Sequence, residues 1–313
     1  MKFLKLFFRR NLVNNKLTWL NIAGLTLGMF TFLFIFFYVY TERNYDQYLP
    51  DAKEVYHLEF TVNKNGARSL YSTTPIPLAK TVWSEVPGIE NWCTFCSIFE
   101  TRVLNNDESD FLNPEMLYAN PEFLLMFHYK AIEGSLDHAL EPGKVVITRS
   151  AAEKYLGTSH AVGKKFKLLH DQKETLNVTV EAVIEDIPYN SNVKFEIVGA
   201  MDDYLKLVGK WVDSWFIKAS QSYITLKKGT DVAQVEKEIE ALVNKYANSA
   251  NRESQGIASV SMENISRKHF KKEYILQHPS ETFVSETSLR VLFLIGLIAL
   301  VISWLNYINF QVF

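Results

Sequence analysis

Two long runs of apolar residues without a charged side chain constrain the fold of this chain more than any other feature. They lie within residues 17–41 and 291–313 of a 313-residue sequence. Because a helix rises about 1.5 Å per residue, roughly 20 residues cross the ~30 Å hydrocarbon core of a bilayer. A backbone in lipid must satisfy its own hydrogen bonds, so each run should be helical. We therefore expect transmembrane helices at residues 19–41 and 289–313. The alternative, a buried core helix of a soluble protein, seldom runs so long without charge.

Charged residues are distributed unevenly around the two runs. The first run is preceded by basic residues and by no acidic one: Lys2, Lys5, Arg9, Arg10 and Lys16. All 35 acidic residues fall between Glu42 and Glu286. Because basic flanks stay on the cytoplasmic side, we expect a cytoplasmic N-terminus and a translocated domain at residues 42–288. The first run exceeds the roughly 7–15 apolar residues of a signal peptide, so we expect a retained anchor.

Residues 1–18 form a basic segment with two interpretations. On a helical wheel, the side chains of Lys2, Lys5, Arg9 and Lys16 gather within about 60°. This pattern predicts a short amphipathic helix on the inner leaflet, attracted to anionic lipid. The alternative is a disordered basic flank that only sets the topology.

The region after Glu42 alternates between strand-like and helix-like segments, which predicts an α+β extracytoplasmic domain between two transmembrane helices, of one or two subdomains. We predict strands at residues 55–62, 89–104, 116–119, 144–148, 164–169, 175–187, 195–201, 223–226, 258–262 and 274–276, and helices at residues 75–86, 121–127, 150–156 and 231–246. We expect the strand at 195–201 to pair with the strand at 175–187.

No pattern typical of a catalytic, cofactor-binding or metal-binding site is found. Cys93 and Cys96 form a C-x-x-C, but in a strand-like segment, where residues three apart face opposite sides and cannot easily pair. Residues 157–165 depart from the glycine spacing of a phosphate-binding loop and are interpreted as a turn. Glu185 and Asp186 are interpreted as a solvated strand end. We therefore expect no enzyme activity in this chain, no cofactor and no nucleic-acid partner.

Some residues within the apolar runs favour contact with another helix. Gly24 and Gly28 form a G-x-x-x-G pattern, which allows two helices to approach closely. Asn306 and Asn309 are polar side chains in the second run, and they would favour facing another helix over facing lipid. We predict a packing role for these four residues.

Several motifs, taken in order, resemble the MacB-like and FtsX-like permeases, the membrane subunits of mechanotransmitting (type VII) ABC transporters. In the first apolar run and its flank, they are Arg10-Asn11, Asn15-Lys16, Asn21, Gly24 and Gly28. In the external region, they are Tyr45-Asp46, Val55-Tyr56, Asn120-Pro121-Glu122-Phe123, Glu133-Gly134, Val145-Val146-Ile147, Leu156-Gly157, Gly163-Lys164, residues 183–188 and Asn190-Ser191. Asn306-Tyr307-Ile308-Asn309 completes the series in the second run.

The resemblance implies a permease subunit in the bacterial inner membrane, with a periplasmic core domain at residues 42–288. It implies a cytoplasmic ABC ATPase subunit that hydrolyses ATP, a second permease copy or half, contact with membrane lipid, and a periplasmic partner. The substrate would be exported or extruded by movement of the external domain. Such permeases continue past the second span, so we expect this chain to be a membrane protein fragment that stops at residue 313.

Two other classes remain as alternatives. A two-span membrane receptor with an extracellular sensing domain would have a ligand pocket outside. A membrane-anchored enzyme would need a reactive site that the sequence patterns do not provide.

Overall fold

The computed structural model describes residues 16–98, 101–104, 111–170, 174–248, 257–270, 274–275 and 283–312. The chain divides into two compact units. The first comprises Met1–Tyr45 with Phe283–Phe313, and the second is Asp46–Thr282.

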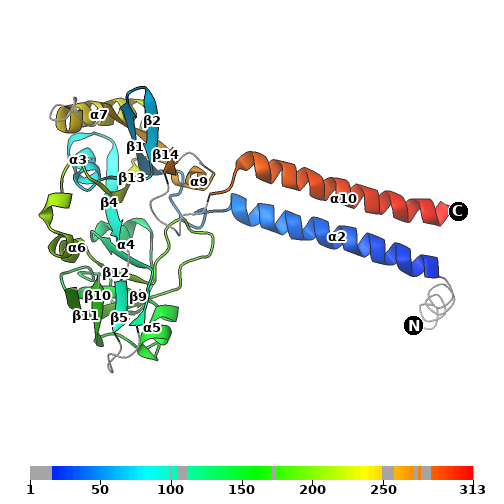
Figure 1. The fold of residues 1–313 in the computed structure, drawn as a ribbon, viewed down its shortest axis with the longest axis horizontal. Helices are drawn as coiled ribbons and strands as arrows, with labels where there is room; N and C mark the ends of the chain where they lie inside the picture. The colour runs from blue at the N-terminus through cyan, green and yellow to red at the C-terminus, as the bar shows by residue number, and fades with distance from the viewer. Residues whose placement is uncertain are drawn as a thin grey trace. The chain divides into compact units, whose positions relative to one another are not determined.

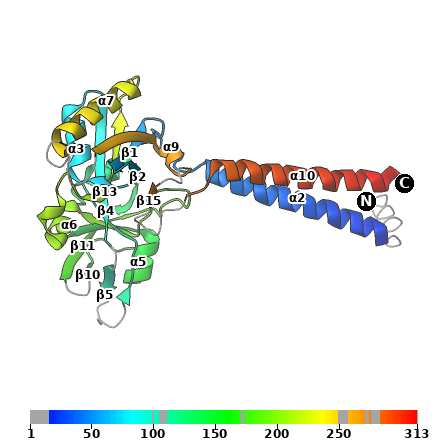
Figure 2. The same cartoon turned by 45° about the horizontal axis from the view of Figure 1, so that its top comes forward.

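The first unit is a pair of long apolar helices, α2 (Lys16–Arg43) and α10 (Glu286–Val312), which run antiparallel and side by side (Figures 1 and 2). Both are long and apolar enough to cross a membrane, with mean hydropathies of 2.2 and 2.4. Their contact includes the rings of Phe32 and Phe293, whose centroids lie 6.2 Å apart. Helices therefore occupy both apolar runs, as predicted.

The second unit combines strands and helices, which confirms the predicted α+β class. Its strands are β1 (Val55–Lys64), β2 (Ala67–Tyr71), β3 (Thr74–Pro75), β4 (Ile89–Ser97), β5 (Thr101–Leu104), β6 (Phe111–Leu112), β7 (Met116–Ala119), β8 (Ala131–Gly134), β9 (Lys144–Thr148), β10 (Lys165–His170), β11 (Glu174–Ile184), β12 (Ile197–Ala200), β13 (Lys218–Leu226), β14 (Ile257–Asn264) and β15 (Tyr274–Ile275). Its helices are α3 (Pro77–Glu85), α4 (Glu122–Met126), α5 (Arg149–Leu156), α6 (Met201–Val208), α7 (Val232–Val243) and α9 (Ile265–Lys268), with a 3-10 turn η1 (Lys210–Val212) and a π turn η2 (Asn244–Asn248).

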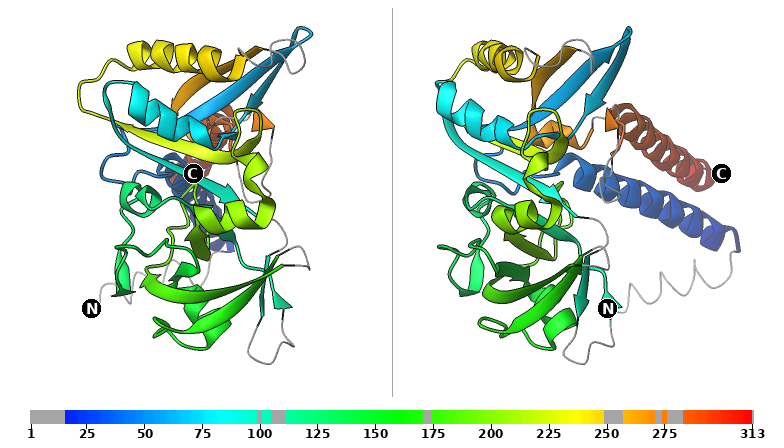
Figure 3. Two further views of the ribbon diagram at one scale, coloured as in Figure 1. Left: turned by 90° about the vertical axis from the view of Figure 1, so that its left-hand side faces the viewer. Right: turned by 60° about the vertical axis from the view of Figure 1, so that its left-hand side comes forward.

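These strands join in the order β15-β2-β1-β13-β4-β7-β12-β9-β11-β10-β5-β6, with β14 added to β1, β3 to β13 and β8 to β11. The blue β1–β2 hairpin lies at one end of the domain and the green β10–β11 pair at the other (Figure 3). We call α3, α7, β1, β2 and β14 the hairpin lobe, and α5, α6, β9, β10 and β11 the α5 lobe. Each lobe has its own buried apolar cluster, and a third cluster around α4, β4 and β7 lies between them.

The helix α7 illustrates how the sequence sets an element. The Asp231 carboxylate accepts hydrogen bonds from the backbone N–H groups of Ala233 and Gln234, at 3.0 and 3.4 Å, and so caps the first turn. Val235 and Ile239 are one helical turn apart and are both buried against the hairpin lobe. The predicted helix was longer, because η2 follows α7 as a single π turn.

The predicted pairing of residues 195–201 with 175–187 is wrong. β12 pairs with β7 in parallel and with β9 in antiparallel orientation, whereas β11 pairs with β8, β9 and β10. β9 separates the two strands because it is apolar on both faces and buried along most of its length. Alternation within a strand shows which face is buried, but it does not identify the neighbouring strand.

Two predicted boundaries also change. The single strand predicted at residues 89–104 is two strands, β4 and β5, which pair with different partners. The predicted strand at 195–201 ends at Ala200, because α6 begins at Met201. By contrast, α5 ends at Leu156 and β10 begins at Lys165, which confirms a helix-to-strand connection at residues 157–164, one residue shorter than predicted.

A buried polar chain joins β5, β10 and β7. His170 forms two hydrogen bonds through its ring nitrogens. Nδ1 lies 2.9 Å from Thr101 Oγ1, and Nε2 lies 2.7 Å from the Tyr118 hydroxyl oxygen. The neutral ring offers one donor and one acceptor nitrogen, so it can satisfy both hydroxyl partners. Burial lowers the pKa of His170 to about 4.

This lowered pKa predicts that the contribution of His170 to the stability of the domain is lost in acid. The unfolded chain takes up a proton at His170 near pH 6.5, whereas the folded chain does so only near pH 4. The contribution of His170 is therefore fully present above pH 6.5 and falls by about 2 kcal/mol between pH 7 and pH 5. His170→Gln should lower stability at pH 7 but remove this loss. Thermal unfolding of the whole chain in detergent at both pH values tests the difference. An equal pH dependence in the parent and the variant would contradict it.

The two cysteines lie on opposite faces of β4, as predicted. Cys93 belongs to the central apolar cluster and Cys96 to that of the α5 lobe, and both thiols are free. Burial raises the pKa of each thiol well above its ordinary value.

Both thiols should therefore be unreactive in the folded protein. We expect no labelling of the native chain by iodoacetamide at pH 8, and labelling of two thiols after denaturation, as counted by mass spectrometry. Rapid labelling of either thiol before unfolding, or a mass that corresponds to a disulfide, would show that the core is packed differently.

Candidate functional site

The helix pair brings one of the two predicted packing glycines to the partner helix. A Cβ added at Gly28 would collide with the side chain of Ser303 on α10, whereas one added at Gly24 would meet nothing within 4 Å. A second close approach lies at Gly296, where a Cβ would come within 3.2 Å of Ile35. Sequence reasoning missed Gly296, although it forms a row of small residues with Ala299 and Ser303 along α10.

The other predicted residues lie away from this contact or outside the described residues. Asn306 and Asn309 are exposed on α10, and Lys16 is the first residue of α2. Lys2, Lys5, Arg9 and Arg10 lie outside the described residues. Their predicted roles in topology and packing stay predictions.

The chain enters the second unit through a buried carboxylate, which is the main polar site that we identify. Asp46 is fully buried, and its two oxygens accept hydrogen bonds from the backbone N–H of Asn192 at 2.9 Å and from the Asn192 side-chain amide at 2.5 Å. Its own backbone N–H donates to the carbonyl oxygen of Asn190 at 2.9 Å. We call these three hydrogen bonds the latch. They tie the residues that follow α2 to the loop between β11 and β12.

The latch depends on a strained and desolvated residue. Asp46 has a φ of 55°, a left-handed conformation that Asp tolerates better than most residues. Burial raises the pKa of Asp46 to about 6, although the hydrogen bonds from Asn192 and the charge of Lys268 act in the opposite direction. Lys268 is itself buried and donates to the Gln221 side-chain oxygen at 2.7 Å and to the Tyr223 hydroxyl at 2.8 Å. A buried carboxylate thus lies in the field of a buried ammonium.

The residues after Asp46 reinforce the attachment. The Tyr48 hydroxyl and Ser191 Oγ lie within hydrogen-bond distance at 2.9 Å, and the Ser191 hydroxyl also donates to the Val193 carbonyl at 3.0 Å. Leu49 and Ala52 are buried in the central apolar cluster. The entry segment is therefore held by polar bonds and by packing. Asp46 and Ser191 belong to separate sequence motifs, which do not predict that the two segments meet.

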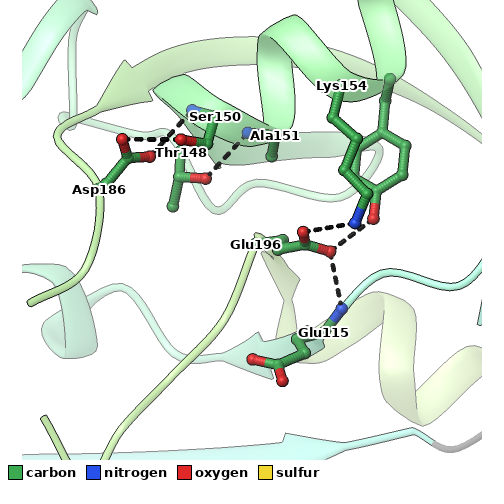
Figure 4. Close-up of polar contacts among 8 residues, drawn as sticks. Glu115, Thr148, Ser150, Ala151, Lys154, Asp186 and Glu196 are labelled. Atoms are coloured by element: carbon green, nitrogen blue, oxygen red, sulfur yellow. Dashed lines mark hydrogen bonds and ion pairs between the residues drawn. The ribbon is translucent and has the colours of Figure 1, made fainter. Parts of the chain in front are cut away.

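Figure 4 shows a second polar network, which holds α5 in place. The Asp186 carboxylate accepts from the backbone N–H and the hydroxyl of Ser150, at 2.9 and 2.8 Å. Glu196 accepts from Lys154 Nζ at 2.7 Å, from the Tyr155 hydroxyl at 2.5 Å and from the Glu115 backbone N–H at 3.2 Å. Asp186 is exposed just after β11, as predicted for a solvated strand end, and here it also caps a helix.

This arrangement suits attachment better than chemistry. Across the described ranges, no group of three His, Cys, Asp or Glu side chains could hold a metal ion. The carboxylates of Asp46, Asp186 and Glu196 are each occupied by donors from the chain itself. The latch and the α5 network therefore link segments that are distant in sequence.

Solved structures similar to this chain are domains of permeases and transporters. One is a domain of a protein described as a permease from Porphyromonas gingivalis, with 18% identity, a TM-score of 0.59, and coverage of 74% of this chain and 95% of that one. Others are the periplasmic region of MacB from Actinobacillus actinomycetemcomitans (14% identity, TM-score 0.46, coverage 68% and 89%) and the extracellular domain of the noncanonic ABC-type transporter YknZ from Gram-positive bacteria (13%, 0.46, 67% and 100%).

A search of curated proteins finds no match. At such low identities, structural similarity is informative about the fold alone. Only the first structure, with its TM-score of 0.59, is similar enough to support the fold assignment. The sequence model of one family, described as MacB-like periplasmic core domain, matches residues 18–242, which is more than half of the chain. The chain therefore belongs to the MacB-like periplasmic core domain family.

Proposed function

We propose that this chain is part of a permease subunit of an ABC transporter. It transmits an ATP-driven conformational change across the inner membrane to a periplasmic domain, and this movement exports or extrudes a substrate. The observation that carries the proposal is the latch, because it fixes Asp46, the first residue of the second unit and close in sequence to the end of α2, inside that unit. Family membership supports the same conclusion.

In this proposal, α2 and α10 cross the bacterial inner membrane and the N-terminus is cytoplasmic. Residues 1–18 contact the inner leaflet through their basic side chains, and residues 42–288 lie in the periplasm. ATP hydrolysis takes place in a separate cytoplasmic ATPase subunit, so this chain needs no catalytic residue. A second permease copy or half and a periplasmic partner complete the assembly.

The latch offers a mechanical route from helix to domain. The 28 residues of α2 form a rod of about 42 Å. Asp46 follows two residues after the Asn44 turn that ends this helix, and it is bound directly to Asn190 and Asn192. That loop continues through the buried Phe195 into β12, at the junction of the central and α5-lobe clusters. In this proposal, a displacement that reaches Asp46 along the chain therefore acts on buried residues and not on a free loop.

Pulsed electron paramagnetic resonance on the full-length permease with its ATPase in lipid nanodiscs tests the proposal. Spin labels at Glu153→Cys on α5 and Lys237→Cys on α7 report the distance between the two lobes. Both positions are exposed, and the native thiols are buried. We expect ATP with vanadate to shift this distance in the otherwise unchanged protein. Absence of any shift would contradict the proposed transmission.

The role of the latch is tested by Asp46→Asn. The amide keeps the shape of the side chain but presents a donor to the Asn192 donors, which costs about 1–2 kcal/mol of stability. We expect the ATP-dependent distance shift to fall by more than half, while the ATPase rate stays within twofold. Asp137→Asn makes the same chemical change at an exposed residue and should leave the shift intact. A full shift in Asp46→Asn would exclude the latch as the coupling element.

A further inference from the structure

A cavity of about 440 Å³ lies within the second unit, between the hairpin lobe and the α5 lobe. Some lining residues, including Lys80 and Trp92, come from α3 and β4, and we call this part of the lining the α3 wall. Others, including Asp202 and Asp213, come from α6 and from the residue after η1, and we call this part the α6 side. Its volume falls in the range of roughly 300–1,000 Å³ that is typical of small-molecule sites. The cavity is separate from the latch and from the α5 network, and neither of those polar sites explains its charged side chains.

The charged groups of the cavity are distributed by sign. Within the described part of the chain, the side chains of Lys80, Asp202 and Asp213 make no hydrogen bond or ion pair. A third lining carboxylate, that of Glu141, is paired with Lys144 Nζ at 2.9 Å. The cavity therefore offers an ammonium on the α3 wall and two unpaired carboxylates on the α6 side.

Much of the remaining lining is apolar or aromatic. Trp92 of β4 belongs to the α3 wall, and its ring lies 6.5 Å from that of Trp83, which is 46% exposed. Met201 of α6 and Leu140 also line the cavity. An indole ring offers a large apolar surface and a face that attracts cations. The lining thus combines apolar and aromatic groups with a positive charge from α3 and negative charges from α6 and the residue after η1.

We propose that this cavity binds a zwitterion with a large apolar body, of the type of a hydrophobic dipeptide. Its free amine lies at Asp202 and Asp213, its carboxylate lies at Lys80, and its side chains contact Trp92 and Met201. Because the ligand bridges two lobes, its binding favours one separation of these lobes over others. Binding does not require that the chain transmit an ATP-driven change, so it can be measured without the ATPase.

Leucyl-4-fluorophenylalanine is a suitable probe, because fluorine NMR measures weak binding to the whole chain in lipid nanodiscs. Two derivatives test the two ends of the ligand. The N-acetyl form lacks the amine, and the C-terminal amide lacks the carboxylate. Solvent-accessible ion pairs contribute up to about 1 kcal/mol, so we expect each derivative to bind roughly fivefold more weakly than the free dipeptide.

Variants assign each preference to its wall. Asp202→Asn with Asp213→Asn should lower the affinity for the free dipeptide roughly fivefold and change the affinity for the N-acetyl form by less than about twofold. Lys80→Gln should also lower the affinity for the free dipeptide roughly fivefold, and should change the affinity for the C-terminal amide by less than about twofold. The control, Glu153→Gln with Glu240→Gln, removes two exposed carboxylates that do not line the cavity. It should leave the affinities for all three ligand forms unchanged.

Comparing the affinities of one variant for the three ligand forms separates a loss of recognition from misfolding. A misfolded protein binds all three forms more weakly, to the same extent. Equal binding of the three forms to the parent chain would overturn the proposal. So would an absence of measurable binding, or an equal loss of the free and N-acetyl forms in the double asparagine variant.

Discussion

The requirement that a backbone in lipid satisfies its own hydrogen bonds is the constraint on which the rest of this structure depends. It makes both apolar runs helical, and it leaves the second unit, Asp46–Thr282, to fold between them. The two ends of that unit are therefore both joined to long helices.

The entry point differs chemically from an ordinary linker. Asp46 is buried, which disfavours its charged form, and Asn192 compensates with two donated hydrogen bonds. Removal of one partner from such a pair leaves a buried group unsatisfied, which costs more than the bond itself contributes. The hydrogen bonds of the latch are consequently either all formed or the domain is clearly destabilised at this point. Lys268 adds a buried positive charge nearby, so both signs of charge are retained inside an otherwise apolar region.

Much of the architecture could be predicted from local sequence patterns. The apolar runs, the Asp231 cap of α7 and the strand at Lys144–Thr148 follow from length, capping and β-branched residues. The neighbours of each strand in the sheet could not be predicted. β9 lies between β11 and β12, and the sequences of β11 and β12 contain no pattern that indicates a strand between them. The latch was hidden for the same reason: Asp46 and Asn192 are 146 residues apart, and each alone is an ordinary polar residue. Gly28 belongs to a spacing pattern that is visible in the sequence, whereas the close approach at Gly296 depends on which face of α10 meets α2.

The most direct test of the proposed topology is the labelling of single introduced cysteines by a membrane-impermeant maleimide in intact spheroplasts. Lys228→Cys lies at an exposed position of the domain, and Lys5→Cys lies in the basic N-terminal segment. The topology predicts that the cysteine at position 228 reacts in intact spheroplasts and that the cysteine at position 5 reacts only after the membrane is permeabilised. Protection of position 228 until lysis, or immediate labelling of position 5, would contradict the placement of the domain outside the inner membrane.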